Sequence, residues 1–267
     1  MIDRITEQPF CQTDVSGSTF INADCFDVFP FIEDKSIDAI ICDLPYGTTA
    51  CKWDVIIPFE PLWKQYDRII KPNGVIVLFG SEPFSSALRM SNIKNYKYDW
   101  VWIKKRFNSG FAHAKNKPLK KHEIISVFSN APMGHKSQLG EKRMIYNPQG
   151  LKPIIKNRNN TTFQNASFGK RPSSRPTTQE YEGFPNNILY YDVEQKGKFL
   201  HPTQKPLELL EYLIKTYTNE GDMVLDNTMG SGTTNLACIK LNRKSIGIEK
   251  EKQYYDVAVR RASEYCH

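Results

Sequence analysis

The chain lacks the features that mark several protein classes. No apolar run approaches the roughly 20 residues needed to cross a bilayer, so we expect no membrane-spanning segment. Its six cysteines form no C-x-x-C pair, so we expect reduced thiols and neither a zinc ribbon nor a redox dithiol. Its five histidines lack metal-ligand spacing, so no metal site is predicted. The N-terminal residues carry mixed charge and no apolar core, so we expect no secretory signal.

Acidic residues are scarce in the middle of the chain. Of 36 basic and 29 acidic residues, the segment 103–178 holds 16 basic and two acidic ones. It therefore carries a net charge of +14 and the remainder −7, a contrast that the whole-chain value of +7 hides. Lys and Arg neutralise phosphates while Asn, Gln and Arg read base edges, so the segment predicts a nucleic-acid surface. The alternative is a solvated, disordered loop, because residues 131–187 show little periodicity beyond loops and short strands.

Apolar runs on both sides of the basic segment predict alternating strands and helices. Two runs end on aspartates, Asp24 and Asp43, as expected of buried strands that present acids at their carboxyl ends. Such alternation predicts an α/β fold with a doubly wound, mostly parallel, Rossmann-like sheet. The predicted strands span residues 19–24, 36–43, 74–80, 98–104, 123–128, 223–226 and 245–249, and the predicted helices 59–71, 206–218, 233–241 and 252–264.

A glycine-containing turn follows one predicted strand. Residues 225–234 read Leu-Asp-Asn-Thr-Met-Gly-Ser-Gly-Thr-Thr, which predicts a strand, a Gly-x-Gly turn and a helix. Gly230 and Gly232 let the backbone approach a ligand, and Glu249 ends the next strand, where it can accept hydrogen bonds from ribose hydroxyls. The pattern predicts a nucleoside-containing cofactor, although an ordinary turn is the alternative. A nicotinamide site would prefer a third glycine where this chain has Asn235.

A second motif, Asp43-Leu44-Pro45-Tyr46-Gly47, follows the strand predicted over 36–43. Pro45 holds the preceding residue extended, which can aim the Leu44 carbonyl at the same point as the Asp43 carboxylate. Two converging acceptors suit an exocyclic amino group, which has two hydrogens to donate. Tyr46 adds a flat face on which a base can stack. Alone the tetrapeptide could be a chance turn, but a glycine turn expected at the same sheet edge favours a site.

The tetrapeptide at 43–46 resembles the [D/N/S]-P-P-[Y/F/W] motif of the amino-methylating DNA methyltransferases, which modify adenine N6 or cytosine N4. The motif order resembles the beta group, with the catalytic motif first, then target recognition, then the cofactor motif. Residues 201–206, His-Pro-Thr-Gln-Lys-Pro, resemble the family's segment beside the cofactor. The resemblance implies a catalytic domain formed by residues 1–130 and 198–267, with a target-recognition insertion at 131–197.

Two positions depart from the family pattern. Leu44 replaces the usual first proline, which costs backbone stiffness but leaves the main-chain carbonyl in place. Asn227-Thr228-Met229 replaces the more frequent Pro-Phe before the glycines, which puts the local packing in doubt. Neither change removes a functional group that the implied chemistry needs.

The resemblance implies S-adenosylmethionine as methyl donor and direct transfer to a base flipped out of double-stranded DNA. Asp43 and the Leu44 carbonyl would hold the amine, with Tyr46 stacked on the base. Glu249 would bind ribose, Asp24 and Cys25 would lie near the adenine, Asp226 and the glycine turn would line the methionine side, and Thr203 with Lys205 would seat its carboxylate. The implied cofactor-binding residues are Asp24, Cys25, His201, Thr203, Lys205, Asp226, Gly230, Gly232, Thr233 and Glu249, and the implied DNA-binding residues are Lys104, Lys105, Arg106, Lys152, Lys156, Arg158, Lys170, Arg171 and Arg175.

The residues and motifs are compatible with several other functions. Cytosine N4 is the closest alternative target, but its methyltransferases more often have serine as the first acceptor, so Asp43 favours adenine. A DNA-binding relative without catalysis, an RNA or protein amide methyltransferase and an NAD-dependent enzyme are less favoured. The resemblance is compatible with a homodimer and with a companion restriction endonuclease as partners, but the sequence decides neither. It implies a cytoplasmic location in a bacterial or phage-infected bacterial cell.

Overall fold

The computed structural model describes residues 8–49, 51, 53–106, 108–158, 164–165, 169–170, 177–193 and 204–266. The chain divides into two compact units, one formed by residues 1–147 and 187–267 and the other by residues 148–186. The larger unit contains both predicted motifs. None of the described helices is long and apolar enough to cross a membrane.

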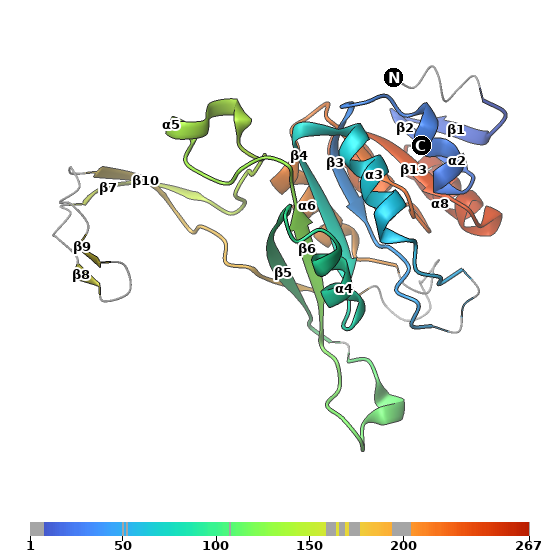
Figure 1. Ribbon diagram of the computed structural model, residues 1–267, viewed down its shortest axis with the longest axis horizontal. Helices are drawn as coiled ribbons and strands as arrows, with labels where there is room; N and C mark the ends of the chain where they lie inside the picture. The colour runs from blue at the N-terminus through green and yellow to red at the C-terminus, as the bar shows by residue number, and fades with distance from the viewer. Residues whose placement is uncertain are drawn as a thin grey trace. The chain divides into compact units, whose positions relative to one another are not determined.

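A nine-stranded sheet forms the centre of the larger unit (Figure 1). Its strands are β1 (Cys11–Val15), β2 (Ser18–Asn22), β3 (Ile37–Cys42), β4 (Ile70–Gly80), β5 (Tyr96–Lys104), β6 (His122–Phe128), β11 (Ile188–Tyr191), β12 (Met223–Asp226) and β13 (Lys244–Glu249). Their order is β1-β2-β13-β12-β3-β4-β6-β5-β11. The run from β2 to β4 is parallel, whereas β6 is antiparallel to both neighbours. The predicted α/β fold with a mostly parallel sheet is confirmed.

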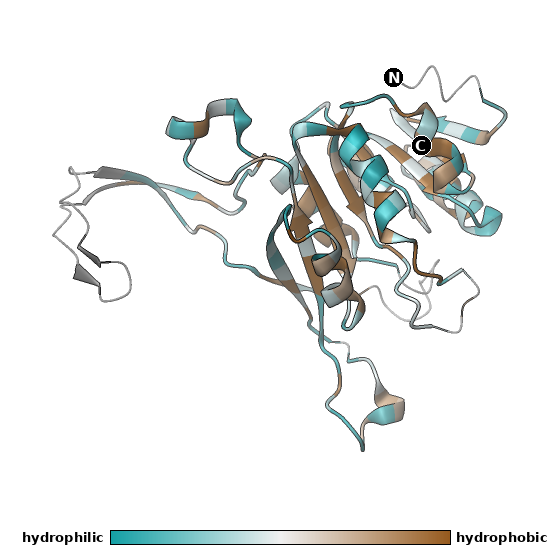
Figure 2. Cartoon of the chain, viewed as in Figure 1, coloured by the Kyte–Doolittle hydropathy of each residue, from teal (hydrophilic) through white to brown (hydrophobic). Residues whose placement is uncertain are grey.

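Helices cover both faces of this sheet because its central strands are apolar on both sides (Figure 2). Along β3, Ile40 packs in the core with α3 and α4, which lie in front of the sheet in Figure 1, and Ile41 packs in the core with α6 and α7. The helices are α2 (Cys25–Val28), α3 (Phe59–Ile69), α4 (Phe84–Ser91), α5 (Lys136–Leu139), α6 (Leu207–Tyr217), α7 (Thr233–Lys240) and α8 (Lys252–Cys266), with 3-10 turns η1 (Phe29–Phe31), η2 (Phe111–His113) and η3 (Gly140–Lys142).

The strand directions bring distant parts of the chain to one edge. Because β3, β12 and β13 are parallel, the residues at their carboxyl ends, Asp43, Asp226 and Glu249, meet there. Strand β5 is antiparallel to β6, which is antiparallel to β4, so β5 also ends at this edge. The loop 105–121 that follows β5 extends beyond the sheet in Figure 1. We call it the basic loop, because it carries six basic and no acidic residues.

The smaller unit is built from short strands. Strands β7 (Lys152–Arg158) and β10 (Thr177–Glu182) pair antiparallel, as do β8 (Gln164–Asn165) and β9 (Gly169–Lys170). None of its described side chains is buried. The expected mixture of loops and short strands is therefore what the described part of this unit contains.

The structure differs from the predicted elements near position 70. The helix that we predicted to end at Lys71 ends at Ile69, and β4 begins at Ile70 rather than at Gly74. Ile70 is buried and pairs with Ile37 of β3, so pairing and burial outweigh the turn signal of Lys71-Pro72-Asn73-Gly74. Elements β1, α2, α4 and β11 were not predicted, because each is short and shows weak periodicity.

One buried hydroxyl in this core allows a test of the packing. Tyr217 on α6 is fully buried and accepts a hydrogen bond from Trp100 Nε1 at 2.6 Å, with Tyr98 Oη at 3.0 Å. Tyr217→Phe should leave the Trp100 donor without its partner and lower the free energy of unfolding in urea by about 1–3 kcal/mol. The matched control is Tyr265→Phe on the exposed side of α8. A loss below about 0.5 kcal/mol in Tyr217→Phe, the range of surface changes, would contradict the role of this hydroxyl.

Candidate active site

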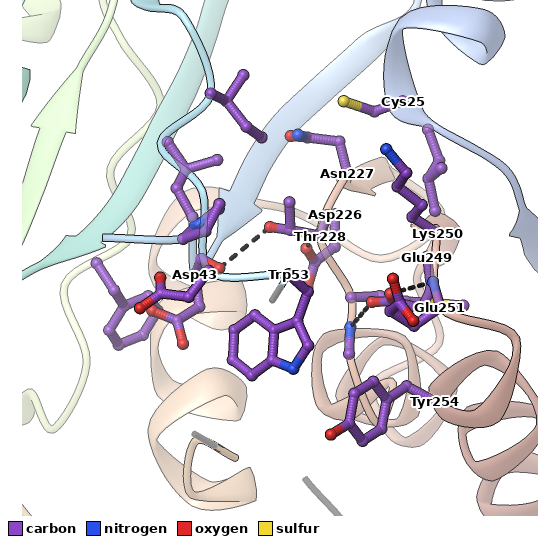
Figure 3. Close-up of a pocket in the computed structure, with 18 of the residues that line it drawn as sticks. Cys25, Asp43, Trp53, Asp226, Asn227, Thr228, Glu249, Lys250, Glu251 and Tyr254 are labelled. Atoms are coloured by element: carbon purple, nitrogen blue, oxygen red, sulfur yellow. Dashed lines mark hydrogen bonds between the residues drawn. The ribbon is translucent and has the colours of Figure 1, made fainter. Parts of the chain in front are cut away.

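A cavity of about 520 Å³ opens at the carboxyl edge of the sheet (Figure 3). Residues that follow β2, β3, β12 and β13 line it, so it combines both predicted motifs. The predicted site residues that line it are Asp24, Cys25, Asp43, Leu44, Pro45, Tyr46, Lys205, Asp226, Gly230, Thr233 and Glu249. His201 and Thr203 lie outside the described residues. Among the described residues, no three His, Cys, Asp or Glu side chains form a group that could hold a metal ion.

The glycine turn is shaped by backbone conformation and close packing. Gly230 and Gly232 have positive φ angles of 52° and 71°, which only glycine adopts without strain. Gly232 does not line the cavity; it caps α7, and a Cβ there would lie 2.7 Å from the Cβ of Ala258. This position therefore requires glycine on two independent grounds.

Glu249 is held at the end of β13 by backbone amides. Its Oε2 accepts a hydrogen bond from Gly230 N at 2.9 Å and its Oε1 accepts one from Glu251 N at 2.8 Å, both drawn in Figure 3. Burial nevertheless raises the pKa of Glu249 above its usual range. Asp24 caps α2 by accepting from Phe26 N at 3.0 Å, so its carboxylate is also fixed at this edge.

The end of β12 carries the buried Asp226 and, directly after it, the departure from the family pattern at Asn227. Asp226 is 4% exposed and accepts a hydrogen bond from Thr228 N at 3.1 Å; burial raises its pKa to about 7. Asn227 is buried and its Oδ1 accepts hydrogen bonds from Tyr66 Oη at 2.5 Å and Cys42 Sγ at 3.1 Å. The Asn227 side-chain oxygen thus has its own partners in place of the usual apolar packing. Thr228 Oγ1 also donates to the Asp43 carbonyl at 3.1 Å, which ties the two motifs together.

The Asp43 carboxylate has a partner on each oxygen. Tyr46 Oη donates to Oδ1 at 2.6 Å, and Lys205 Nζ forms an ion pair with Oδ2. Burial raises the pKa of Asp43, while Lys205 opposes that rise. The Tyr46 ring lies 5.0 Å from that of Phe84, and the Leu44 side chain is buried in the core. The tetrapeptide is therefore anchored by both its polar and its apolar side chains.

Two of the predicted site lysines form ion pairs that the sequence did not reveal. Lys205, expected at a cofactor carboxylate, lies between Asp43 and Glu123, with its Nζ 3.5 Å from Glu123 Oε2. Lys104, expected on a DNA surface, forms a 2.6 Å ion pair with Glu123 Oε1, and its side chain is only 12% exposed. Both lysines meet the same physical requirement, because a carboxylate largely removed from solvent, such as Glu123, needs cationic partners.

The remaining predicted DNA-binding residues are partly described. Lys105 and Arg106 are exposed in the basic loop, and Arg106 Nε lies 3.2 Å from Asp192 Oδ2. Lys152 is exposed on β7. Lys156 and Arg158 lie in β7 and Lys170 in β9, with side chains outside the description, and Arg171 and Arg175 lie wholly outside it.

The sequence did not reveal several residues of this cavity. Asp54 fixes the loop after the tetrapeptide, because its carboxylate accepts hydrogen bonds from Gly47 N, Thr48 N and Thr49 N at 2.7–2.9 Å. Trp53 stands in the cavity with its ring edge-on to Tyr254, 6.4 Å between centroids (Figure 3). Glu251, Lys250 and Gln204 also line the cavity. These positions lie in loops or helix starts, where no periodicity marks them.

Known proteins are similar to this chain in both sequence and fold. A family profile described as DNA methylase matches residues 37–260. The type II methyltransferase M.HpaI of Haemophilus parainfluenzae is 30% identical over 240 residues, which are 86% of this chain and 69% of that protein. The type II methyltransferase M1.MboII of Moraxella bovis is 29% identical over 255 residues, 88% of this chain and 92% of that protein.

Solved structures agree with these relatives. The crystal structure of the M1.HpyAVI-SAM complex is 25% identical, with a TM-score of 0.58 over 90% of this chain and 96% of that one. The cytosine-N4-specific PvuII DNA methyltransferase, at 16% identity, has a TM-score of 0.62 over 93% of this chain and 87% of that one, which shows a shared fold. The profile match and the 30% identical relative confirm the resemblance seen in the motifs: the chain belongs to the N6/N4 DNA methylase family.

Proposed function

We propose that this DNA methyltransferase transfers a methyl group from S-adenosylmethionine to adenine N6 of a base flipped out of double-stranded DNA. The observation that carries the proposal is a single cavity in which the Asp43 tetrapeptide faces the strand ends of Asp226 and Glu249. The cavity therefore has an amine-binding motif and a nucleoside-binding motif within one space. A methyl transfer between two bound molecules needs this proximity.

The lining of the cavity fits this cofactor. Among the described residues, six carboxylates and two lysines line it, an excess of negative charge that suits the sulfonium and ammonium groups of S-adenosylmethionine. Glu249 is oriented by the turn amides so that it can receive the ribose hydroxyls, and Asp226 lies on the proposed methionine side. Asp24 and Cys25 would flank the adenine, with Trp53 as a further aromatic wall. His201 and Thr203 stay proposed cofactor residues on the basis of the motif.

The chain's own residues prepare the target amine. When bound, the cofactor supplies an electrophilic methyl group on its sulfonium sulfur. The amine of adenine is a weak nucleophile because its lone pair is delocalised into the ring. Asp43 and the Leu44 carbonyl accept its two N–H groups, draw the nitrogen towards tetrahedral geometry and stabilise its developing positive charge. Tyr46 stacks on the base. The amine nitrogen bonds to the methyl carbon as the bond from that carbon to sulfur breaks, so transfer is direct and in line, without a covalent enzyme intermediate. The extra proton on the methylated nitrogen is then lost to solvent.

DNA binding is assigned to the positive parts of the chain. The target-recognition region is placed at residues 131–197, which contain the smaller compact unit of residues 148–186. The basic loop, with Lys105 and Arg106, adds phosphate contacts beside the cavity. A homodimer and a companion restriction endonuclease are further proposed partners, the latter because the named relatives are type II methyltransferases.

Cytosine N4 is the second candidate target, since PvuII methyltransferase has a similar fold and is cytosine-N4-specific. Asp43 as the first acceptor favours adenine over cytosine. Expression in a methylation-free bacterial host, followed by long-read mapping of modified bases, distinguishes the two targets and reports the recognised sequence. Methylated adenine at a defined site supports the proposal, methylated cytosine supports the second candidate, and an unmodified genome contradicts both.

Removal of the Asp43 carboxylate should abolish catalysis but not DNA binding. In Asp43→Ala the target amine loses its charged acceptor, so we expect methyl transfer from tritiated S-adenosylmethionine to fall by at least about 10³-fold. Affinity for duplex DNA, measured by fluorescence anisotropy, should change less than about threefold, because phosphate contacts dominate it. Full activity of folded Asp43→Ala would rule out the assigned acceptor.

Cofactor binding should release protons through Asp226. Because its pKa is about 7 in the free protein, Asp226 is roughly half protonated at pH 7, and a bound cation favours the carboxylate. Calorimetry in buffers of different ionisation enthalpy should show release of roughly half a proton at pH 7. Release should decline above that pH, where Asp226 is already ionised. Asp226→Asn should lose this release, whereas Asp222→Asn, outside the cavity, should keep it. Equal release in both variants would disprove the linkage.

Charge reversal on β7 should weaken DNA binding. The triple variant Lys152→Glu, Lys156→Glu, Arg158→Glu removes up to three phosphate contacts, so the slope of log K against log salt should flatten by about one unit per contact. Lys64→Glu on the exposed side of α3 is the control and should leave the slope unchanged. An unaltered slope in the triple variant would place the DNA surface elsewhere.

A further inference from the structure

Lys205 is a buried cation shared by two carboxylates. Its Nζ forms an ion pair with Asp43 Oδ2 and lies 3.5 Å from Glu123 Oε2, while its side chain is 9% exposed. The rings of Phe79 and Tyr46 lie 5.2 Å and 5.8 Å from the ammonium. In such a water-poor setting, the two carboxylates and the ring faces replace the hydration of the cation.

Glu123 is itself fixed from its other side. It belongs to β6, two positions from β3 in the sheet, and its Oε1 accepts the Lys104 ammonium at 2.6 Å. The side chains of Glu123 and Lys104 are each 12% exposed. The four groups form a row of alternating charge, Asp43, Lys205, Glu123 and Lys104, that runs from the tetrapeptide to the end of β5. Lys205 therefore has a second anion within reach that does not move with the tetrapeptide.

The proposed reaction requires that the Asp43 carboxylate leave its present partners and bind the target amine. Asp43 Oδ1 accepts the Tyr46 hydroxyl at 2.6 Å and Oδ2 contacts Lys205, so both oxygens already have partners when the target amine arrives. A cation beside the acceptor keeps Asp43 ionised, but it also competes with the amine and repels the positive charge that develops on the attacking nitrogen. Lys205 is thus useful before the base enters and unfavourable while the methyl group moves.

We propose that Lys205 and Glu123 are positioning residues that act through Asp43. Lys205 holds the Asp43 carboxylate ionised and oriented until the base arrives, and Glu123 then keeps the Lys205 ammonium while Asp43 turns to the amine. The first half rests on the geometry alone, and the second half rests on the proposed function.

The charged groups around Asp43 give the two residues opposite effects on it. Among the described residues, the groups that face it are Tyr46 on its own loop, Lys205 before α6, Glu123 on β6 and Asp226 on β12. Burial raises the pKa of Asp43, the Lys205 cation lowers it and the Glu123 anion raises it. Removal of the cation should therefore move Asp43 titration to higher pH, and removal of the neighbouring anion should move it to lower pH. General damage to the fold would not produce opposite shifts.

The first experiment follows Asp43 directly, without cofactor or DNA. Protein labelled with ¹³C at the aspartate carboxyl is titrated by NMR, and the Asp43 resonance is assigned by its loss in Asp43→Asn. Lys205→Met should raise the midpoint by about one pH unit or more, and Glu123→Gln should lower it. Lys205→Arg, which keeps the charge, should stay near wild type. The control is Lys71→Met, which breaks the 2.6 Å pair with Asp38 at the other end of β3 and should leave Asp43 unchanged.

The second experiment tests the transfer of the ammonium to Glu123. Glu123→Gln should lower kcat by about tenfold, an effect confined to the reacting complex, while the Kd for S-adenosylmethionine by calorimetry stays at the wild-type value. If Lys205→Met fails to fold, the first half is tested with Lys205→Gln and with the direction in which Glu123→Gln moves the midpoint of Asp43 titration. Midpoints that stay fixed or move in the same direction overturn the first half, and an unchanged kcat in Glu123→Gln overturns the second. An inactive wild-type protein would overturn the proposed function, whereas the NMR shifts would still decide the first half.

Discussion

The parallel pairing of β3 with β12 is the constraint on which the rest of the site depends. Val224 pairs with Ala39 and Leu225 with Ile40, so two strands far apart in sequence end side by side. The tetrapeptide leaves one strand and the glycine turn leaves the other, joined by the hydrogen bond from Thr228 Oγ1 to the Asp43 carbonyl. A shift of this register by one residue would turn Asp43 to the opposite face and separate the two motifs. The apolar residues of both strands hold the register, because each face is buried under helices.

This arrangement buries charged groups, which is energetically unfavourable. The strand ends bring Asp43, Asp226 and Glu249 into a water-poor edge, and burial raises the pKa of each carboxyl. Different groups stabilise the buried carboxylate at each position. Backbone amides hold Glu249 and a lysine neutralises Asp43. A backbone amide, a nearby hydroxyl and the Cys42 thiol oppose the effect of burial on Asp226. Three acids of similar intrinsic strength therefore have different partners, which suits the proposed binding of a cation at one end of the cavity and an amine at the other.

The sequence predicted the parts of the site that are encoded locally. Gly230 and Gly232 need a special backbone conformation, and Asp43 to Tyr46 directly follow a strand, so short motifs suffice to find them. The fold class followed from alternating apolar runs. The Lys205 and Glu123 contact could not be predicted, because it joins separate elements 82 positions apart and has no spacing signature. Lys104 was counted with the surface charge because sequence alone does not show that β5 places it beside a buried carboxylate.

Acidic and basic parts of the chain lie next to each other at the carboxyl edge of the sheet. In the part of the chain that the structure describes, the cavity there is lined by six carboxylates and two lysines, whereas the basic loop that leaves the same edge carries six basic residues and no acidic one. Phosphates are therefore attracted to the loop and repelled from the cavity. An uncharged base that donates hydrogen bonds meets no such repulsion, and the acidic wall offers it acceptors. Separation of charge at one sheet edge thus favours entry of the base alone, which is the selectivity that the proposed base flipping requires.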